Sequence, residues 1–313
     1  MAELFDMKEL EERVILVAVS TSDEDDTEAS LDELEELVKT AGGTAVARSV
    51  QKRERIHPGH YLGTGKIEEL KAMLSAYDAT GIVCDDELSP AQLRNLEQML
   101  GTKVMDRTIV ILDIFAARAL SGEGKIQVEL AQLKYRLSRL TGMGASMSRL
   151  GGGIGTRGPG EKKLETDRRY IKERIAELNK DAQEIRTHRE LLRAQRSKKG
   201  TPVISLVGYT NAGKSTILNR LSDAGVLAED KLFATLDTTT RKIELPGGSE
   251  VFLTDTVGFI QKLPHHLVQA FRATLEELQY ADILLHVVDA SDANRAEHIE
   301  VIRCGRLGVR ILL

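Results

Sequence analysis

Short apolar runs alternate with amphipathic stretches along the first 120 residues of the chain. Four runs predict β-strands, at Val14–Ser20, Thr44–Val50, Gly81–Cys84 and Lys103–Met105. Four stretches with helical spacing follow them, at Thr27–Thr40, Gly65–Leu74, Ser89–Leu100 and Arg107–Leu120. Strands that alternate with helices predict an α/β domain with a largely parallel sheet over residues 1–120.

A second pattern covers residues 121–199, where apolar positions repeat every three or four residues on both sides of a glycine-rich break. The two seams consist of Ile126, Leu130, Leu133, Leu137 and Leu140, then Leu164, Ile171, Ile175, Leu178, Ala182, Ile185 and Leu192. Two helices with such seams predict an antiparallel coiled-coil hairpin. The second helix should run for about 35 residues, or ~50 Å. Since each seam is covered by the partner helix, the hairpin should project as an arm.

The third segment, residues 200–313, opens with the apolar run Val203–Val207. The next residues are Gly208-Tyr209-Thr210-Asn211-Ala212-Gly213-Lys214-Ser215, and a helix-like run begins at Thr216. A strand, a glycine-bounded loop ending in Lys-Ser and a helix form the context of a phosphate-binding P-loop. Lys214 would reach the β- and γ-phosphates, and the Ser215 hydroxyl would hold Mg²⁺. The alternative is a glycine turn that merely joins a strand to a helix, which the register of Lys and Ser disfavours.

Two later segments stand where a GTPase senses the γ-phosphate. Phe233-Ala234-Thr235-Leu236-Asp237-Thr238-Thr239-Thr240-Arg241 is a threonine-rich loop of the switch type. A predicted hairpin of Ile243–Leu245 and Val251–Leu253 leads into Asp255-Thr256-Val257-Gly258. Asp255 would hold Mg²⁺ through water, and the Gly258 amide would bond the γ-phosphate. Phe259 takes the place of the water-orienting glutamine of Ras-type enzymes, and Ile283–Val288 predicts a buried strand that ends at Asp289.

Charge is distributed unevenly along a chain of net charge -5. Residues 1–40 hold fourteen acidic against three basic residues, whereas residues 121–200 hold nineteen Lys/Arg against ten Asp/Glu. A basic middle predicts an anionic partner such as RNA, and a solvated helical surface is the alternative. Six of the ten residues in the loop 151–160 are glycine, which suits either a flexible linker or contact with RNA. The side chains expected to contact RNA are Arg149, Arg157, Lys162, Lys163, Arg168 and Arg169.

Composition describes an ordinary globular protein, with 42% hydrophobic and 29% charged residues. No apolar run approaches the ~20 residues that span a bilayer, and the acidic N-terminus lacks the layout of a signal peptide. Cys84 and Cys304 lie far apart without metal-ligand spacing, so we expect a cytoplasmic protein with inert thiols. Within the first domain, the loop from His57 to Lys66 could meet phosphate through its amides, but a plain turn is at least as favoured.

Together these residues resemble the HflX family of ribosome-associated GTPases. The specific matches are Gln127 to Tyr135, Gly151 to Glu161, Leu164 to Arg169, Gly208 to Thr216, Phe233 to Asp237 and Asp255 to Ile260. The resemblance implies an N-terminal α/β domain, a helical arm and a G domain, and a factor that binds the large ribosomal subunit to split stalled or stress-damaged ribosomes. It also implies that Thr235 is the switch threonine on Mg²⁺, with Thr238, Thr239 and Thr240 as rivals, and that the N-terminal domain could bind ATP.

The end of the chain departs from the family. There the G domain continues to an Asn-Lys-x-Asp motif and a C-terminal domain, whereas this chain ends at Leu313 and residues 303–313 do not resemble the family sequence. We hypothesise a frameshift or an early stop, which the coding DNA read in three frames would test. Losing the Asp that binds guanine should cost about 1.5–3 kcal/mol or more, or ~10–100-fold in affinity. The last strand of the sheet should then be an exposed edge.

The sequence therefore predicts an α/β protein with three parts, namely an N-terminal α/β domain, an antiparallel coiled-coil hairpin and an incomplete P-loop, Ras-like GTPase domain. The expected catalytic residues are Lys214, Thr235 and Gly258, and the expected Mg²⁺ ligands are Ser215, Thr235 and Asp255. The expected nucleotide contacts are Gly208, Tyr209, Thr210, Asn211, Ala212, Gly213, Lys214, Ser215, Thr216, Phe233, Ala234, Thr235, Leu236, Asp237, Asp255, Thr256, Val257 and Gly258. We expect a monomer that hydrolyses GTP slowly. The alternatives are a non-catalytic protein that binds the ribosome or RNA through the arm and, less favoured, another P-loop ATPase or kinase.

Overall fold

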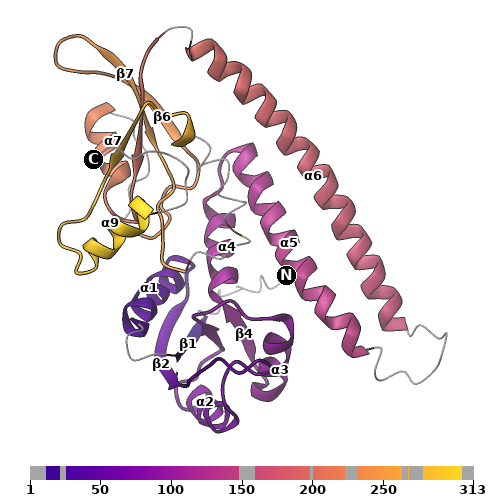
Figure 1. Cartoon of the computed structure of the whole chain (residues 1–313). Coiled ribbons are helices and arrows are strands. Elements are labelled where there is room, and N and C mark those ends of the chain that lie inside the picture. The colour runs from indigo at the N-terminus through magenta and orange to yellow at the C-terminus, as the bar shows by residue number, and fades with distance from the viewer. Residues whose placement is uncertain are drawn as a thin grey trace, which may run out of the picture. The chain divides into compact units, whose positions relative to one another are not determined.

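The computed structural model describes residues 12–21, 26–147, 159–197, 200–222, 231–262, 267 and 278–304 (Figure 1). The chain divides into two compact units, Met1–Ile111 and Leu112–Leu313. The predicted contacts Arg149 and Arg157 and most of the loop 151–160 lie outside the described residues.

The first unit alternates strands and helices as the pattern predicts. Its elements are β1 (Arg13–Ser20), α1 (Thr27–Thr40), β2 (Thr44–Lys52), α2 (Thr64–Ala76), β3 (Gly81–Cys84), α3 (Pro90–Leu100), β4 (Lys103–Asp106) and the start of α4 (Arg107–Arg118). The strands pair in the order β2-β1-β3-β4, and all three pairings are parallel. The prediction of an α/β domain with a parallel sheet is confirmed.

Local sequence explains where the helices of this unit begin. The Asp26 side chain accepts a hydrogen bond from the Ala29 amide at the start of α1. Ser89 caps α3 and exchanges side-chain to backbone bonds with Gln92, and Pro90 takes the first helical position. Such caps satisfy amides that a helix terminus leaves without partners.

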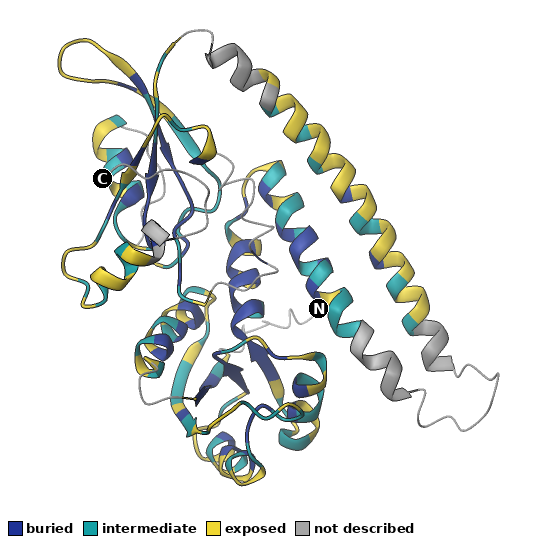
Figure 2. Cartoon of the chain, viewed as in Figure 1, coloured by how far each residue is buried: buried dark blue, intermediate teal, exposed yellow. Residues whose placement is uncertain are grey.

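The core of the first unit fills the faces of its sheet (Figure 2). On one face, buried side chains of β1 meet apolar residues of α2 and α3, with Ile15, Val17, Ile67, Leu70 and Leu96 in one cluster. Helix α1 lies against β1 and β2 and buries its apolar stripe of Leu31, Leu34, Leu37 and Val38. Cys84 is fully buried in this core, and burial raises the pKa of its thiol, so the thiol stays protonated and unreactive.

A buried ion cluster lies beyond the carboxyl end of β3. The guanidinium of Arg107 donates to Asp85 over 2.8 Å and to Glu33 over 2.6 Å, and it also donates to the Ser30 carbonyl over 2.8 Å. Burial opposes the charge on Arg107, but Asp85 and Glu33 more than offset it and raise the pKa of the arginine. The cluster therefore joins α1, β3 and α4 through charges that are paired within the unit.

Helices α5 (Gly122–Met147) and α6 (Pro159–Ser197) form the predicted hairpin. Leu130, Leu133, Ile171 and Leu178 are the buried centre of its seam, flanked by Ile126, Leu137, Leu140, Ile175 and Ala182. Arg174 pairs with Glu129, and Arg189 pairs with Glu123. Because higher numbers on α6 meet lower numbers on α5, the two helices run antiparallel. Most of the described outer surface of α6 is exposed (Figure 2).

The remaining elements build the second sheet. They are β5 (Val203–Val207), α7 (Lys214–Ser222), β6 (Thr239–Glu244), β7 (Glu250–Asp255), β8 (Ile283–His286) and α9 (Arg295–Cys304). The strand order is β6-β7-β5-β8, with β6 and β7 antiparallel and the other pairs parallel. The predicted hairpin across Pro246–Ser249 is thereby confirmed, although β6 begins earlier, at Thr239.

The expectation of a buried strand at residues 283–288 is wrong. Strand β8 covers residues 283–286 alone, and Ile283 and Leu285 are 47% and 44% exposed. Among the described strands β8 pairs with β5 on one side, so its other side is a sheet edge and one of its faces is open.

Candidate nucleotide-binding site

The P-loop joins β5 to α7, as the sequence predicts. The chain passes so close to the neighbouring strand that a Cβ atom on Gly208 would collide with the carbonyl oxygen of Val287. Glycine is therefore required at the start of the loop. At the other end, Gly213 leads into α7, whose first residues are Lys214 and Ser215. Gly213, Lys214, Ser215 and Thr216, at the positive end of α7, line the pocket in which a phosphate chain would bind.

Lys214 is enclosed by the loop that it follows. Its side chain is 6% exposed, and its Nζ donates to the carbonyl oxygen of Tyr209 over 2.5 Å. Burial lowers the pKa of Lys214 to about 8, and the nearby Asp255 offsets part of this effect. A phosphate next to the ammonium group would add negative charge and raise the pKa of Lys214 again.

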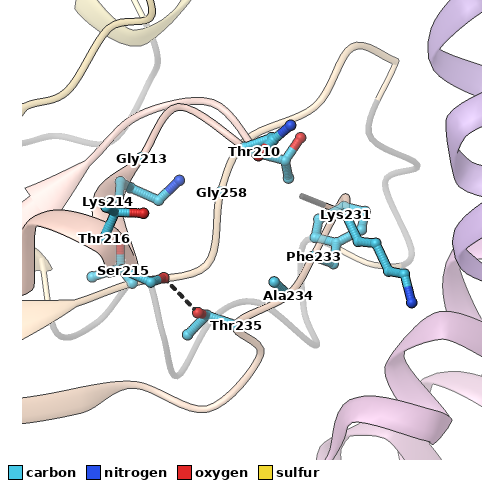
Figure 3. Close-up of a pocket in the computed structure, with 12 residues that line it drawn as sticks. Thr210, Gly213, Lys214, Ser215, Thr216, Lys231, Phe233, Ala234, Thr235 and Gly258 are labelled. Carbon is cyan, nitrogen blue, oxygen red and sulfur yellow. Dashed lines mark hydrogen bonds between the residues drawn. The ribbon is translucent and has the colours of Figure 1, made fainter. Parts of the chain in front are cut away.

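Three oxygen-bearing side chains converge beside Lys214. The Ser215 hydroxyl donates to Asp255 over 2.6 Å and lies 2.7 Å from the Thr235 hydroxyl (Figure 3). The second carboxylate oxygen of Asp255 is buried and has no hydrogen-bond partner in the described structure. Burial raises the pKa of Asp255, although Ser215 and Lys214 oppose that rise. We call these three residues the oxygen cluster.

The oxygen cluster selects one threonine from the threonine-rich loop. Thr235 reaches Ser215, whereas Thr239 and Thr240 belong to strand β6, where the Thr240 hydroxyl bonds that of Thr254 at 2.9 Å. Thr238 lies just before that strand and does not line the pocket. The structure therefore brings Thr235, and not its rivals, to the predicted metal position.

The Asp255–Gly258 segment is attached directly to the P-loop. The Thr210 amide donates to the Phe259 carbonyl over 2.8 Å, and the Phe259 amide donates to Gly208 over 3.1 Å. A Cβ atom on Gly258 would lie 2.5 Å from the Thr210 Cα atom and 2.8 Å from the Lys214 Nζ atom. The backbone at position 258 can therefore lie this close to the P-loop only because glycine has no side chain.

Two residues close to Thr235, Phe233 and Asp237, are held by contacts outside the pocket. Phe233 is 2% exposed and packs edge-on against Phe115 of α4, with ring centroids 4.9 Å apart. The carboxylate of Asp237 accepts bonds from the amides of Leu120 and Ser121, at 2.9 and 2.8 Å. The switch-type loop is therefore fixed to the segment that leads into helix α5.

The pocket is lined by most of the predicted phosphate-side residues (Figure 3). The lining comprises Thr210, Asn211, Gly213, Lys214, Ser215, Thr216, Lys231, Phe233, Ala234, Thr235, Thr256 and Gly258. The lining does not include Gly208, Tyr209, Ala212, Leu236, Asp237, Asp255 or Val257, which stand behind or beside it. Lys231 was missed by the sequence analysis because no motif covers it.

A further contact behind the P-loop also escaped the sequence analysis. The rings of Tyr209 and His298 stack with centroids 3.6 Å apart, and the His298 ring lies 3.3 Å from the Asp292 carboxylate. This contact places α9 against the outer side of the loop. Tyr209 and His298 are 89 residues apart in the sequence, so local hydrophobic periodicity cannot predict that they meet.

The predicted RNA contacts on α6 and the loop from His57 to Lys66 are in part engaged in contacts within the fold. Arg168 donates from its guanidinium to the Leu140 carbonyl over 2.6 Å, so part of this side chain holds the hairpin together. Arg169 is exposed, and the side chains of Lys162 and Lys163 lie outside the described ones. In the loop from His57 to Lys66, the amides of Gly59 and His60 donate to the His57 ring, so they are already used within a turn.

The described residues also limit what the site can contain. No group of three or more His, Cys, Asp or Glu side chains in this part of the chain could hold a metal ion alone. A Mg²⁺ ion here would need hydroxyl and phosphate oxygens in addition to Asp255, which is the way that nucleotide sites bind it. No helix in the described ranges is both long and apolar enough to cross a bilayer.

The chain also matches known protein families and curated proteins. Three family models match the chain, and they are described as GTP-binding GTPase N-terminal over residues 28–116, GTP-binding GTPase Middle Region over 118–196 and 50S ribosome-binding GTPase over 203–309. The chain is 69% identical over 292 residues to GTPase HflX of Lacrimispora saccharolytica, which covers 93% of this chain and 69% of that protein. It is 46% identical over 299 residues to GTPase HflX of Escherichia coli, which covers 96% and 70%.

A solved structure matches the fold as a whole. The crystal structure of SsGBP and GDP complex has a TM-score of 0.52 and 24% sequence identity, and the match covers 94% of this chain and 79% of that one. At this identity the likeness concerns the fold, which agrees with the predicted α/β architecture and P-loop domain.

Proposed function

The chain belongs to the HflX family of GTPases, and from this premise we propose that it hydrolyses GTP on the large ribosomal subunit to split or rescue stalled ribosomes under stress. GTP binding and hydrolysis are the activity of the family. The ribosomal part of the proposal is supported by the model that matches residues 203–309, described as 50S ribosome-binding GTPase. A cytoplasmic location is part of the same proposal.

The oxygen cluster is the observation that carries the nucleotide part. Thr235 comes from a loop 20 residues after Ser215, and Asp255 comes from the end of β7, yet both side chains lie within hydrogen-bond distance of the Ser215 hydroxyl. A buried carboxylate oxygen without a partner is costly in a folded protein. A cation that bridges these oxygens to a phosphate would remove that cost.

The residues present fit Mg²⁺. Ser215 and Thr235 would offer hydroxyl oxygens to the ion, and Asp255 would hold its hydration shell, as the sequence predicts. Bound there, the ion would neutralise charge on the β- and γ-phosphates. The donor set contains no thiol or imidazole, which disfavours softer metals.

The chain's own residues would act mainly by electrostatic stabilisation. Lys214 and the P-loop residues that line the pocket would bind the phosphates, and the Gly258 amide would bond the γ-phosphate. None of the described residues that line the pocket carries a carboxylate or an imidazole, so no side chain of the lining can deprotonate the attacking water. Since Phe259 replaces the water-orienting glutamine, we predict slow intrinsic turnover.

Acceleration by the ribosome would then complete the site. The segment 121–200 carries nineteen Lys/Arg against ten Asp/Glu, and such a surface is attracted to ribosomal RNA. On α6, Arg169 and Lys172 line an exposed hollow together with Glu165, Thr166 and Arg168. Contact with RNA along this arm would bring the G domain to the large subunit.

The test compares turnover of GTP and ATP by the 313-residue chain, with and without purified large subunits. We expect hydrolysis of GTP that rises with added subunits and that Lys214→Ala abolishes. Absence of any acceleration would contradict the ribosomal part. RNA binding with a steep salt dependence and no dependence on nucleotide would favour the alternative, a non-catalytic ribosome- or RNA-binding protein.

A further inference from the structure

The carboxylate of Asp237 binds the two residues that precede helix α5. It accepts hydrogen bonds from the Leu120 and Ser121 amides at 2.9 and 2.8 Å and from the Ser121 hydroxyl. The Ser121 hydroxyl in turn accepts from the Gly124 amide over 2.8 Å. The Gly124 amide of α5 is thus satisfied by Ser121, the N-cap residue just before the helix, and Asp237, more than 100 residues away in the sequence, holds that residue by its amide and its hydroxyl.

Asp237, which holds this cap residue, belongs to the loop that would sense the γ-phosphate. Thr235 stands two residues before Asp237 and lies 2.7 Å from Ser215. On the other side of Thr235, Phe233 is fixed against Phe115 and has a backbone φ of 53°, a conformation that a bulky side chain rarely adopts without support. A loop held at both ends in this way can place Thr235 at the oxygen cluster with little further ordering.

We infer that Asp237 is a positioning residue that couples the γ-phosphate sensor to the helical hairpin: when Thr235 is held at the oxygen cluster, Asp237 holds Ser121, the N-cap residue of α5, and when Thr235 leaves it, this hold and with it the cap are weakened. This inference rests on the proposed nucleotide site and adds how that site communicates with the arm. A negative charge at a helix N-terminus is favourable, so the cap has a free energy that the loop can transmit. By linkage, whatever the triphosphate adds to the cap, the cap adds to triphosphate binding.

Coupling predicts an effect on nucleotide preference, which a merely structural cap would not have. The test measures the affinities of the 313-residue chain for GDP and for a non-hydrolysable GTP analogue, both with Mg²⁺. In Asp237→Ala the preference for the analogue over GDP should fall by about 5-fold or more. Asp237→Asn should recover part of it, because the asparagine side-chain oxygen can still accept the bonds from the Leu120 and Ser121 amides.

A second pair of variants displaces the cap without changing Asp237. A Cβ atom on Gly124 would collide with the Asp237 carboxylate, the mobile end of a side chain, whereas a Cβ atom on Gly122 would meet nothing within 4 Å. Gly124→Ala should therefore reduce the preference as Asp237→Ala does, and Gly122→Ala, in the same turn of α5, should match the unaltered chain. Thermal unfolding of each variant checks that it is folded.

Hydrogen exchange gives the reciprocal readout. The amides of Leu120, Ser121 and Gly124 should be better protected with the GTP analogue than with GDP, and this difference should disappear in Asp237→Ala. Equal protection with both nucleotides, or an unchanged preference in Asp237→Ala and Gly124→Ala, would overturn the coupling while leaving the proposed function intact. Failure of the unaltered chain to bind the analogue at all would instead overturn the proposed function.

Discussion

Two buried ion clusters in this protein use similar side chains and differ in how well their charges are compensated. In the first unit, Arg107 lies within 2.8 Å of both Asp85 and Glu33, and burial of the guanidinium is more than offset by these carboxylates. In the second, Lys214 donates to a backbone carbonyl, and Asp255 retains a buried oxygen without a partner. The pKa of Arg107 is raised, whereas that of Lys214 is lowered to about 8.

The difference separates structural charges from binding charges. In a paired cluster, removal of one partner leaves the other charge buried and uncompensated. The fold therefore needs both members. A cluster in which burial lowers the pKa of the lysine and raises that of the aspartate has room for both an anion and a cation. A phosphate chain with Mg²⁺ provides both, so the same comparison indicates which cluster binds nucleotide.

The largest expected effect is on stability. Arg107→Ala should lower the free energy of unfolding by about 3–5 kcal/mol, because Asp85 would be left buried without a counterion. Urea unfolding of the chain measures this. The matched control is Arg48→Ala, whose partners Asp32 and Glu35 are exposed, and its cost should stay below about 1 kcal/mol. Equal costs for the two variants would contradict the contrast between buried and exposed pairs.

The second effect is on binding. Lys214→Ala should weaken binding of the GTP analogue by about 10- to 100-fold or more, since a charge-assisted contact to phosphate is lost. Without nucleotide its free energy of unfolding should not fall, because burial already disfavours the Lys214 charge. Calorimetric titration and urea unfolding provide the two numbers. A loss of stability as large as that of Arg107→Ala would show that Lys214 is also a structural charge.

A third pair compares two buried aspartates. Asp255→Asn should raise the Mg²⁺ concentration needed for nucleotide binding by about 10- to 100-fold, the usual cost of a lost metal-orienting group. Asp85→Asn should lower stability and leave that Mg²⁺ requirement unchanged. Fluorescent-nucleotide binding over a Mg²⁺ series distinguishes them, and identical Mg²⁺ curves for Asp255→Asn and the unaltered chain would remove Asp255 from the metal site.

The smallest effect is on pH dependence. With a pKa of about 8 in the free protein, Lys214 must take up a proton to bind phosphate above that pH. Affinity for the analogue should therefore be level below pH 8 and fall by up to about tenfold per pH unit above it. Lys214→Met should remove this fall, and a slope that survives in that variant would assign it to another group.

The lowered pKa of Lys214 affects stability in the opposite direction, so that stability rises with pH where affinity falls. The folded pKa of about 8 lies below the ordinary value of 10.5, so the unfolded chain binds more protons between these values. Without nucleotide, the free energy of unfolding should rise with pH across this window relative to Lys214→Met. Urea unfolding at pH 8 and pH 10 measures the difference.

Much of the fold follows from local pattern. Helix α1 has the predicted bounds, and the seam of Leu130, Leu133, Ile171 and Leu178 packs as its heptad spacing predicts. Period and capping are properties of neighbouring residues, so one sequence is sufficient to find them. The P-loop is equally local, because eight consecutive residues carry its chemistry.

What escaped prediction depends on contacts between distant segments. The sequence offered four threonines near the metal position, and the pairing of β6 with β7 was needed to exclude Thr239 and Thr240. The Asp237 side chain belongs to a predicted nucleotide-contact loop, yet it reaches the start of α5. The stacking of Tyr209 on His298 and the open face of β8 likewise arise from tertiary packing, which local spacing does not encode.

The central claim is that Lys214 and the oxygen cluster are completed by a triphosphate and Mg²⁺. The most direct measurement is calorimetric titration of the chain with the GTP analogue and with GDP, each in Mg²⁺ and in EDTA. We predict that Mg²⁺ tightens binding of the analogue more than that of GDP, because Thr235 and Gly258 would act on the γ-phosphate. Equal affinities in Mg²⁺ and EDTA, or no binding of either nucleotide, would contradict the claim.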